Sequence, residues 1–67
     1  MIEIVLNGAP HQVPPQHTLF DLITALSLEN QALALAVNRS VVPRKVWHER
    51  VLETRDQVEI VRAIGGG

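Results

Sequence analysis

The sequence predicts an α+β fold, in which one small mixed sheet of about four to five strands carries one main helix on one face. Alternating apolar residues near both ends of the chain predict strands, and a leucine-rich stretch between them predicts an amphipathic helix. The resulting order is β-β-α-β-(β)-β. One apolar helical face and one apolar face per strand allow a single helical layer packed on a single sheet.

Size and composition indicate one domain over residues 1–67. The 67 residues are 46% hydrophobic and 19% charged, and a chain this short buries only about 60% of its unfolded surface. The formal net charge of -1 provides no broad positive field for a phosphate backbone, so we expect no nucleic-acid partner. We expect the protein to be a monomer.

The absence of Cys excludes disulfides, thiolate metal sites and a cysteine nucleophile, and it fits a reducing compartment. The N-terminal residues carry neither the basic region nor the cleavage site of a signal peptide, and no apolar run is long enough to span a bilayer. We therefore expect a cytoplasmic protein without membrane contact.

The first two strands are predicted to form a hairpin. Ile2–Leu6 alternates between apolar and other side chains, and Asn7-Gly8 supplies two residues that tolerate positive φ. The returning strand, around Pro10 to Val13, should lie at a sheet edge because proline cannot donate to a ladder. Pro14-Pro15 should end this strand.

One amphipathic helix is predicted from about Thr18 to Ser27. Thr18 and Asp21 resemble a capping box at its start. The apolar residues at positions i, i+3, i+4 and i+7 share one helical face, and they are Leu19, Leu22, Ile23 and Leu26. Asp21 could also be read as catalytic, but its place beside Thr18 favours the capping role.

The second half of the chain predicts three further strands. Leu33–Val37 alternates large residues with alanines, which gives one bulky face and one small face. Val41-Val42 follows a turn and predicts a brief partner strand, and Val58–Val61 predicts the last strand after the polar turn Glu53–Gln57. The first and last strands are expected to be central neighbours; if they are parallel, the connection between them contains the helix.

Several side chains leave two interpretations open. Trp47 could be an anchor for a partner or a core residue. The alanine face of Leu33–Val37 could dock an enzyme or be a tolerated exposed face. The three histidines lie in different segments without the spacing of a zinc motif, so we predict solvated surface residues and no metal site; they are His11, His17 and His48.

The sequence ends in three glycines, Gly65–Gly67, three residues after the last predicted strand. A glycine-rich terminus alone would more commonly be a frayed end or a vector-derived addition. Glycines lack Cβ atoms and can therefore thread a narrow channel in another protein. If Arg62–Gly67 is extended at about 3.3 Å per residue, it reaches roughly 20 Å beyond the domain.

The motifs together resemble the ubiquitin-related β-grasp sulfur carriers, and within them the ThiS family. They are Asn7-Gly8, Thr18-Leu19, Leu22, Ala36–Asn38, the approach to the final strand over Leu52–Val61, and the terminal Gly66-Gly67. The resemblance covers the full length and implies a ubiquitin-like β-grasp domain over residues 1–67, with a flexible tail over residues 62–67. One departure is Arg55-Asp56, where the family commonly has Gly-Asp.

The resemblance implies a sulfur carrier for thiazole formation in thiamine biosynthesis, which is not an enzyme. A ThiF-like adenylyltransferase would use ATP and Mg to adenylate Gly67, and a sulfur donor enzyme would displace AMP to give a thiocarboxylate (1-thioglycine). A ThiG-like thiazole synthase would then receive the sulfur. Gly65 and Gly66 would give the tail access to the partner's active site, and Arg62, Ala63 and Ile64 would be partner contacts.

The chain has no phosphate-binding glycine loop, so ATP is expected to bind the partner and no cofactor is expected to bind this protein. Three alternatives remain open from the sequence. A MoaD-like carrier for molybdopterin would use the same chemistry, a TGS-like module would bind without covalent chemistry, and a ubiquitin-like modifier would form isopeptide bonds.

Overall fold

The computed structural model describes residues 1–62, which form one five-stranded sheet and one α-helix. The elements are β1 (Ile2–Leu6), β2 (Ala9–Val13), α1 (Leu19–Ala25), β3 (Leu33–Val37), β4 (Ser40–Val42), the 3-10 helix η1 (Arg44–Val46) and β5 (Gln57–Arg62). The strand order in the sheet is β2-β1-β5-β3-β4. The predicted α+β class and element order are therefore confirmed.

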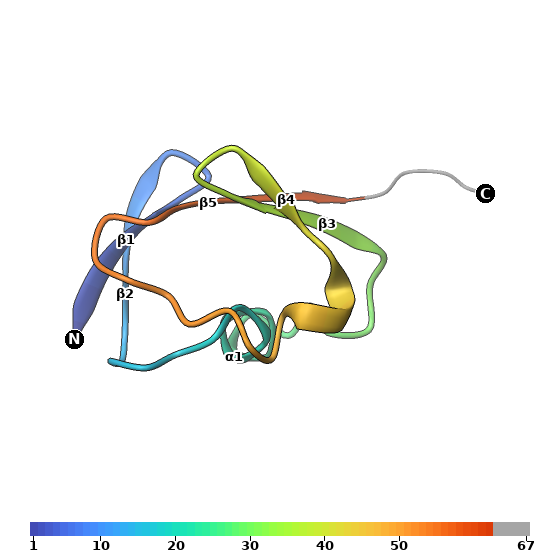
Figure 1. The fold of residues 1–67 in the computed structure, drawn as a ribbon, viewed down its shortest axis with the longest axis horizontal. Helices are drawn as coiled ribbons and strands as arrows, with labels where there is room; N and C mark the ends of the chain where they lie inside the picture. Colours follow the sequence, from blue (N-terminus) through green and yellow to red (C-terminus); the bar gives the residue numbers. More distant parts are fainter. Residues whose placement is uncertain (63–67) are drawn as a thin grey trace.

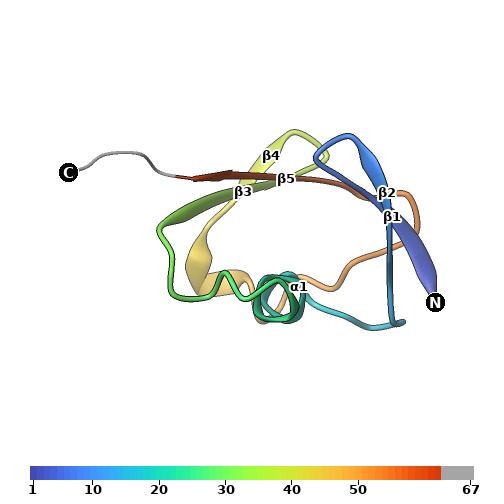
Figure 2. The same cartoon turned by 180° about the vertical axis from the view of Figure 1, so that it is seen from behind.

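The two central strands are the first and the last in the chain. β1 and β5 are parallel, with Val5 opposite Gln57 and Leu6 opposite Val58. β3 is antiparallel to β5 on its other side. The connection from β1 to β5 carries α1 across one face of the sheet, as Figure 1 and the reverse view in Figure 2 show. Both the parallel pairing and the placement of the helix agree with the sequence prediction.

The first hairpin forms as predicted, with β2 at the edge of the sheet. Its two-residue turn requires positive φ at both positions, and Asn7 and Gly8 adopt φ values of 49° and 84°. A second two-residue turn joins β3 to β4, where Asn38 and Arg39 have φ values of 52° and 72°. The short strand predicted at Val41-Val42 is confirmed as part of β4.

Helix α1 begins with the predicted capping box. The Thr18 hydroxyl accepts a hydrogen bond from the Asp21 backbone N–H, and the Asp21 carboxylate accepts one from the Thr18 N–H, both at 3.1 Å. The Thr18 backbone N–H, followed by the Thr18 hydroxyl, lowers the pKa of Asp21 below its ordinary value of 3.8. The helix ends at Ala25, earlier than predicted, because Ser27 adopts a left-handed conformation with a φ of 61°.

The core lies between the sheet and α1. Its buried side chains come from α1, from the inward positions of the strands and from the segment after β4; they are Ile4, Val13, Leu19, Leu22, Ile23, Leu35, Val37, Trp47, Leu52 and Val58. Trp47 is only 1% exposed, and its Nε1–H donates a 2.8 Å hydrogen bond to the Val42 carbonyl. The open question about Trp47 is thereby decided, since it fills the core.

A buried carboxylate that the sequence did not reveal holds the turn before β5. Asp56 is 7% exposed and accepts hydrogen bonds from Asn38 Nδ2 at 3.1 Å, Arg50 Nη2 at 3.2 Å and the Glu53 N–H at 2.8 Å. The preceding Arg55 has a φ of 73°. The turn thus takes a left-handed conformation that glycine adopts without steric cost, although arginine stands at this position.

The last strand is two residues longer than predicted, one at each end. It begins at Gln57, which the sequence placed in the preceding polar turn. β5 extends to Arg62, which pairs with Leu33 of β3. The predicted tail over residues 62–67 is therefore wrong in its first residue, because Arg62 belongs to the sheet. Beyond it remain residues 63–67, which would span at most about 17 Å when fully extended.

The three histidines, predicted to be solvated surface residues, differ in exposure, and both His17 and His48 lie near Asp21. His48 is exposed and its ring stacks on that of Phe20 with centroids 4.0 Å apart, while His11 and His17 are half-buried. Within residues 1–62, no group of three or more potential ligands is placed to hold a metal ion. None of the helices in this part of the chain has the length and apolar character needed to cross a membrane.

Candidate functional site

The face of the sheet opposite α1 is open, and over β3, β4 and the end of β5 it is mostly apolar. Side chains alternate along each strand, so the residues of β5 that do not face the core point to this side. Val61 of β5 is 61% exposed there, and Val41 of β4 is 76% exposed. Ala34 is also exposed and Ala36 is half-buried. The predicted small face of β3 therefore remains uncovered within the described chain.

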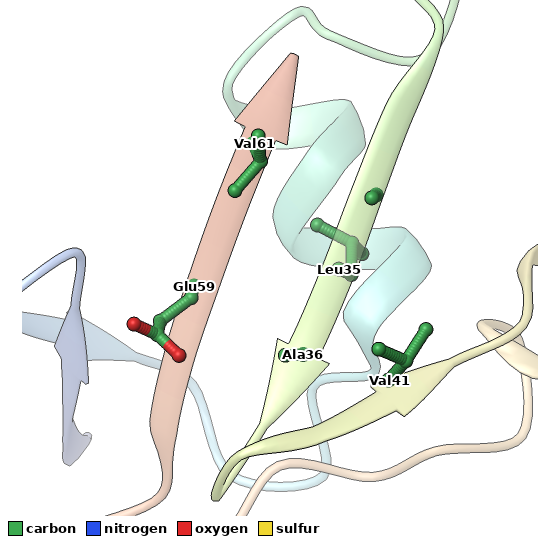
Figure 3. Close-up of a pocket in the computed structure, with 6 residues that line it drawn as sticks. Leu35, Ala36, Val41, Glu59 and Val61 are labelled. Carbon is green, nitrogen blue, oxygen red and sulfur yellow. The ribbon is translucent and has the colours of Figure 1, made fainter. Parts of the chain in front are cut away.

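These residues line a shallow groove across β4, β3 and β5, which we call the open-face groove. It is lined by Ala34, Leu35, Ala36, Val41, Glu59 and Val61, and Figure 3 shows the labelled side chains along the strands. Glu59 contributes the only charged group among these lining residues. A shallow apolar surface with one carboxylate is suited to contact with another protein and lacks the convergent polar groups of a catalytic pocket.

The middle of β5 is held in place by the first hairpin. The Asn7 N–H donates to the Val58 carbonyl, and the Asn7 Oδ1 accepts from the Ile60 N–H, each at 2.9 Å. The Asn7 side chain thereby takes the position that a further residue of β1 would occupy in the ladder. Sequence analysis identified Asn7 only as a turn residue. Its second role depends on a strand that lies far along the chain.

Arg62 is the one predicted site residue that the structure describes. It lies exposed at the end of β5, opposite Leu33, where its guanidinium can meet a partner. The other predicted site residues lie outside the described residues; they are Ala63, Ile64, Gly65, Gly66 and Gly67. The described part of the site is therefore the C-terminal end of β5, with the open-face groove beside it.

Comparison with known proteins identifies the family. The model of the ThiS family matches residues 4–67, which covers nearly the whole chain and includes the terminal glycines. The chain belongs to the ThiS family.

Two matched relatives are each named a sulfur carrier protein ThiS. The Escherichia coli protein is 29% identical over 66 residues, which cover 98% of this chain and 100% of the relative. The Bacillus subtilis protein is 36% identical over 50 residues, which cover 75% and 76%.

A third relative is much longer than this chain. It is a thiazole synthase from Magnetococcus marinus, which is 38% identical over 66 residues. The match covers 98% of this ThiS-family chain and only 20% of the synthase. This chain therefore corresponds to about one fifth of that protein.

A solved structure supports the fold. The crystal structure of the thiamine biosynthesis protein ThiS from Geobacter metallireducens superposes with a TM-score of 0.82 and covers 98% of this chain and 100% of the other. The sequence identity is 23%, so the likeness supports the architecture alone. The predicted ubiquitin-like β-grasp fold is confirmed by the mixed sheet, the single helix and this superposition.

Proposed function

We propose that this protein is the sulfur carrier of thiazole formation in thiamine biosynthesis, and that it serves as a protein co-substrate of other enzymes. The observation that carries the proposal is the family match, because it extends over residues 4–67 and so includes Gly65–Gly67. The names of the Escherichia coli and Bacillus subtilis relatives support the carrier role. The family match also favours thiamine biosynthesis over the molybdopterin pathway.

The chemistry would take place on the carboxyl group of Gly67. A carboxylate is a poor electrophile, so a ThiF-like adenylyltransferase with ATP and Mg²⁺ would first convert it to a glycyl adenylate and release pyrophosphate. Sulfide, supplied by a donor enzyme, would then attack the carbonyl carbon and expel AMP. The product is a thiocarboxylate, in which a C–S bond has replaced one C–O bond without any change in oxidation state.

The absence of side chains on Gly65 and Gly66 would allow this segment to enter the narrow active site of the adenylyltransferase. Arg62 would contact the partner at the mouth of that site, together with Ala63 and Ile64. ATP and Mg²⁺ would be held by the partner, because the sequence lacks the glycine motif of a phosphate-binding loop.

A ThiG-like thiazole synthase is proposed as the acceptor of the sulfur. The Magnetococcus marinus relative supports this partner, since a segment similar to 98% of this chain forms part of a protein named thiazole synthase. Two activities that are joined in one polypeptide commonly serve the same reaction. We infer that this domain meets such a synthase when the sulfur is transferred.

A labelling experiment tests the carrier function. The protein is incubated with a ThiF-like adenylyltransferase, ATP, Mg²⁺ and sulfide, then treated briefly with iodoacetamide and digested for mass spectrometry. Because the chain contains no Cys, a thiocarboxylate is the only thiol-like group that can react rapidly. We expect the label on Gly67.

The matched control is the same chain with one alanine added after Gly67. This addition leaves the described domain unchanged but places a methyl-bearing residue at the reacting terminus, so labelling should be lost. An unlabelled Gly67 with an adenylyltransferase that loads its own carrier would disprove the proposal. Equal labelling of the extended chain at its new terminus would show that the terminal glycine is not required.

A further inference from the structure

The last three residues of β5, Ile60–Arg62, have a strand neighbour on one side only. On the β3 side, the antiparallel ladder continues to the end of the strand, where Arg62 lies opposite Leu33. On the β1 side, the parallel ladder contains only the pairs Val5–Gln57 and Leu6–Val58. Within residues 1–62, β5 therefore extends beyond the end of β1, as Figure 1 also shows.

The hydrogen-bonding direction along β5 follows from the bonds beside it. The Asn38 N–H donates to the Gln57 carbonyl on the β3 side, and peptide groups alternate in direction along a strand. The Ile60 N–H points the other way and donates to Asn7 Oδ1. The Ile60 carbonyl and the Arg62 N–H consequently point to the side that β1 no longer covers. We call this the β5 open edge.

The two outer edges of the sheet are protected in a way that the β5 open edge is not. β2 contains Pro10 and runs into Pro14-Pro15, and β4 is followed directly by Pro43. Proline lacks an N–H and discourages the pairing of another strand. Ile60–Arg62 contains no proline, and its outward peptide groups can bond to an extended chain.

We propose that the β5 open edge binds a β-strand of the adenylyltransferase, which pairs with Ile60–Arg62. The proposal rests on the carrier function above and names a contact for it. The edge immediately precedes residues 63–67, so a strand bound here would align the chain that leads to Gly67. Main-chain hydrogen bonds would provide the affinity, as in other cases of strand addition.

The open-face groove indicates what side chain this strand should carry. An added strand continues the pleat of the sheet, so its alternate side chains lie on the same face as Val61 and Glu59. Val61 is 61% exposed, and an apolar side chain placed beside it would remove both from water. The partner strand is therefore expected to carry an aliphatic or aromatic residue on the face opposite α1.

Amide hydrogen exchange gives a direct test. In the free 15N-labelled protein, the Arg62 N–H should exchange rapidly, whereas the Val61 N–H, which faces β3, should be protected. Addition of the adenylyltransferase should slow exchange at Arg62 by at least about tenfold, with a smaller change at Val61. Rapid exchange at Arg62 in a complex that still labels Gly67 would overturn the strand pairing while the carrier function stands.

Substitutions at one position separate the backbone from the side chain. Arg62→Pro removes the outward N–H and leaves the β3 ladder intact, while Arg62→Ala keeps the N–H and removes the guanidinium. We expect the dissociation constant for the adenylyltransferase to be about tenfold higher for Arg62→Pro than for Arg62→Ala. Equal constants would contradict the proposal.

A second copy of this chain is the competing occupant of the edge. If it bound there, protection of the Arg62 amide would increase with protein concentration in the absence of the adenylyltransferase. That result would overturn the assignment to the partner enzyme. Failure of an active adenylyltransferase to label Gly67 would instead refute the carrier function itself, so the two hypotheses fail separately.

Discussion

The two faces of the sheet are built from the same strands and have opposite character. On the face that α1 covers, Leu35 and Val58 are at most 1% exposed. On the other face, their near neighbours Ala34 and Val61 are exposed. The contrast shows that the two faces have separate roles. The residues facing α1 stabilise the fold, and those on the opposite face remain available to a partner.

The physical basis of this division is the size of the side chains. Full burial of a leucine or valine contributes about 1.5–3 kcal/mol, and the fully buried leucines and valines of the sheet lie on the face toward α1. Alanines on the open face bury little area and therefore contribute little to stability. They also leave room for the side chains of another protein to approach the sheet. Substitutions on the covered face should consequently change the free energy of unfolding, and substitutions on the open face should change the affinity for a partner.

The largest effect is expected on the covered face. Leu22→Ala leaves a cavity between α1 and the sheet and should lower the free energy of unfolding by about 2–5 kcal/mol, as measured by urea denaturation. If that variant is unfolded, Ile23→Val should still fold and lose about 0.5–1.5 kcal/mol. Val41→Ala on the open face is the matched control and should change stability by less than about 0.5 kcal/mol. Equal losses on both faces would refute the comparison.

The next largest effect is expected in the turn before β5, where Asp56 accepts three hydrogen bonds. Asp56→Ala leaves Asn38, Arg50 and the Glu53 N–H without their shared acceptor, which should cost about 1–3 kcal/mol in the free energy of unfolding. Glu53→Ala, which retains the backbone N–H, is the control and should be nearly neutral. A neutral Asp56→Ala would mean that these donors are satisfied by water.

The open face should be sensitive to substitution in binding rather than in stability. Val61→Ser should leave the urea midpoint nearly unchanged, because this side chain is already 61% exposed. It should raise the dissociation constant for the adenylyltransferase about threefold to tenfold, through loss of buried apolar area. Glu3→Gln lies away from the groove and is the control for binding. Unchanged affinity of Val61→Ser would remove the open-face groove from the interface.

The smallest effect is expected at the cap of α1. Because the pKa of Asp21 is lowered in the folded state, its contribution to stability is present above the unfolded pKa and is lost as the pH falls through the folded pKa. Asp21→Asn should therefore lower Tm slightly at neutral pH. The difference from the unsubstituted protein should shrink below the ordinary pKa of 3.8. A difference that grew in acid would show that the sign of this linkage is wrong.

Much of the fold could be predicted because its signals are local. The period of two in Ile2–Leu6 and Leu33–Val37, the turn residues Asn7-Gly8 and the capping pair at Thr18 each act within a few residues. Even the open face was foreseeable, since alternating alanines can form only a small face. The assignment of Gly65–Gly67 as the reactive tail came from resemblance to the family and remains a prediction.

The features that could not be predicted depend on contacts between distant segments. Trp47 fits a core or an interface equally well until its surroundings are known. Asp56 reads as a surface residue until Asn38 and Arg50 converge on it. Sequence periodicity therefore determined which side chains share a face, because this follows from backbone geometry alone. Tertiary structure decided which polar groups are buried and which strand edge stays open, because both depend on where separate strands end relative to one another.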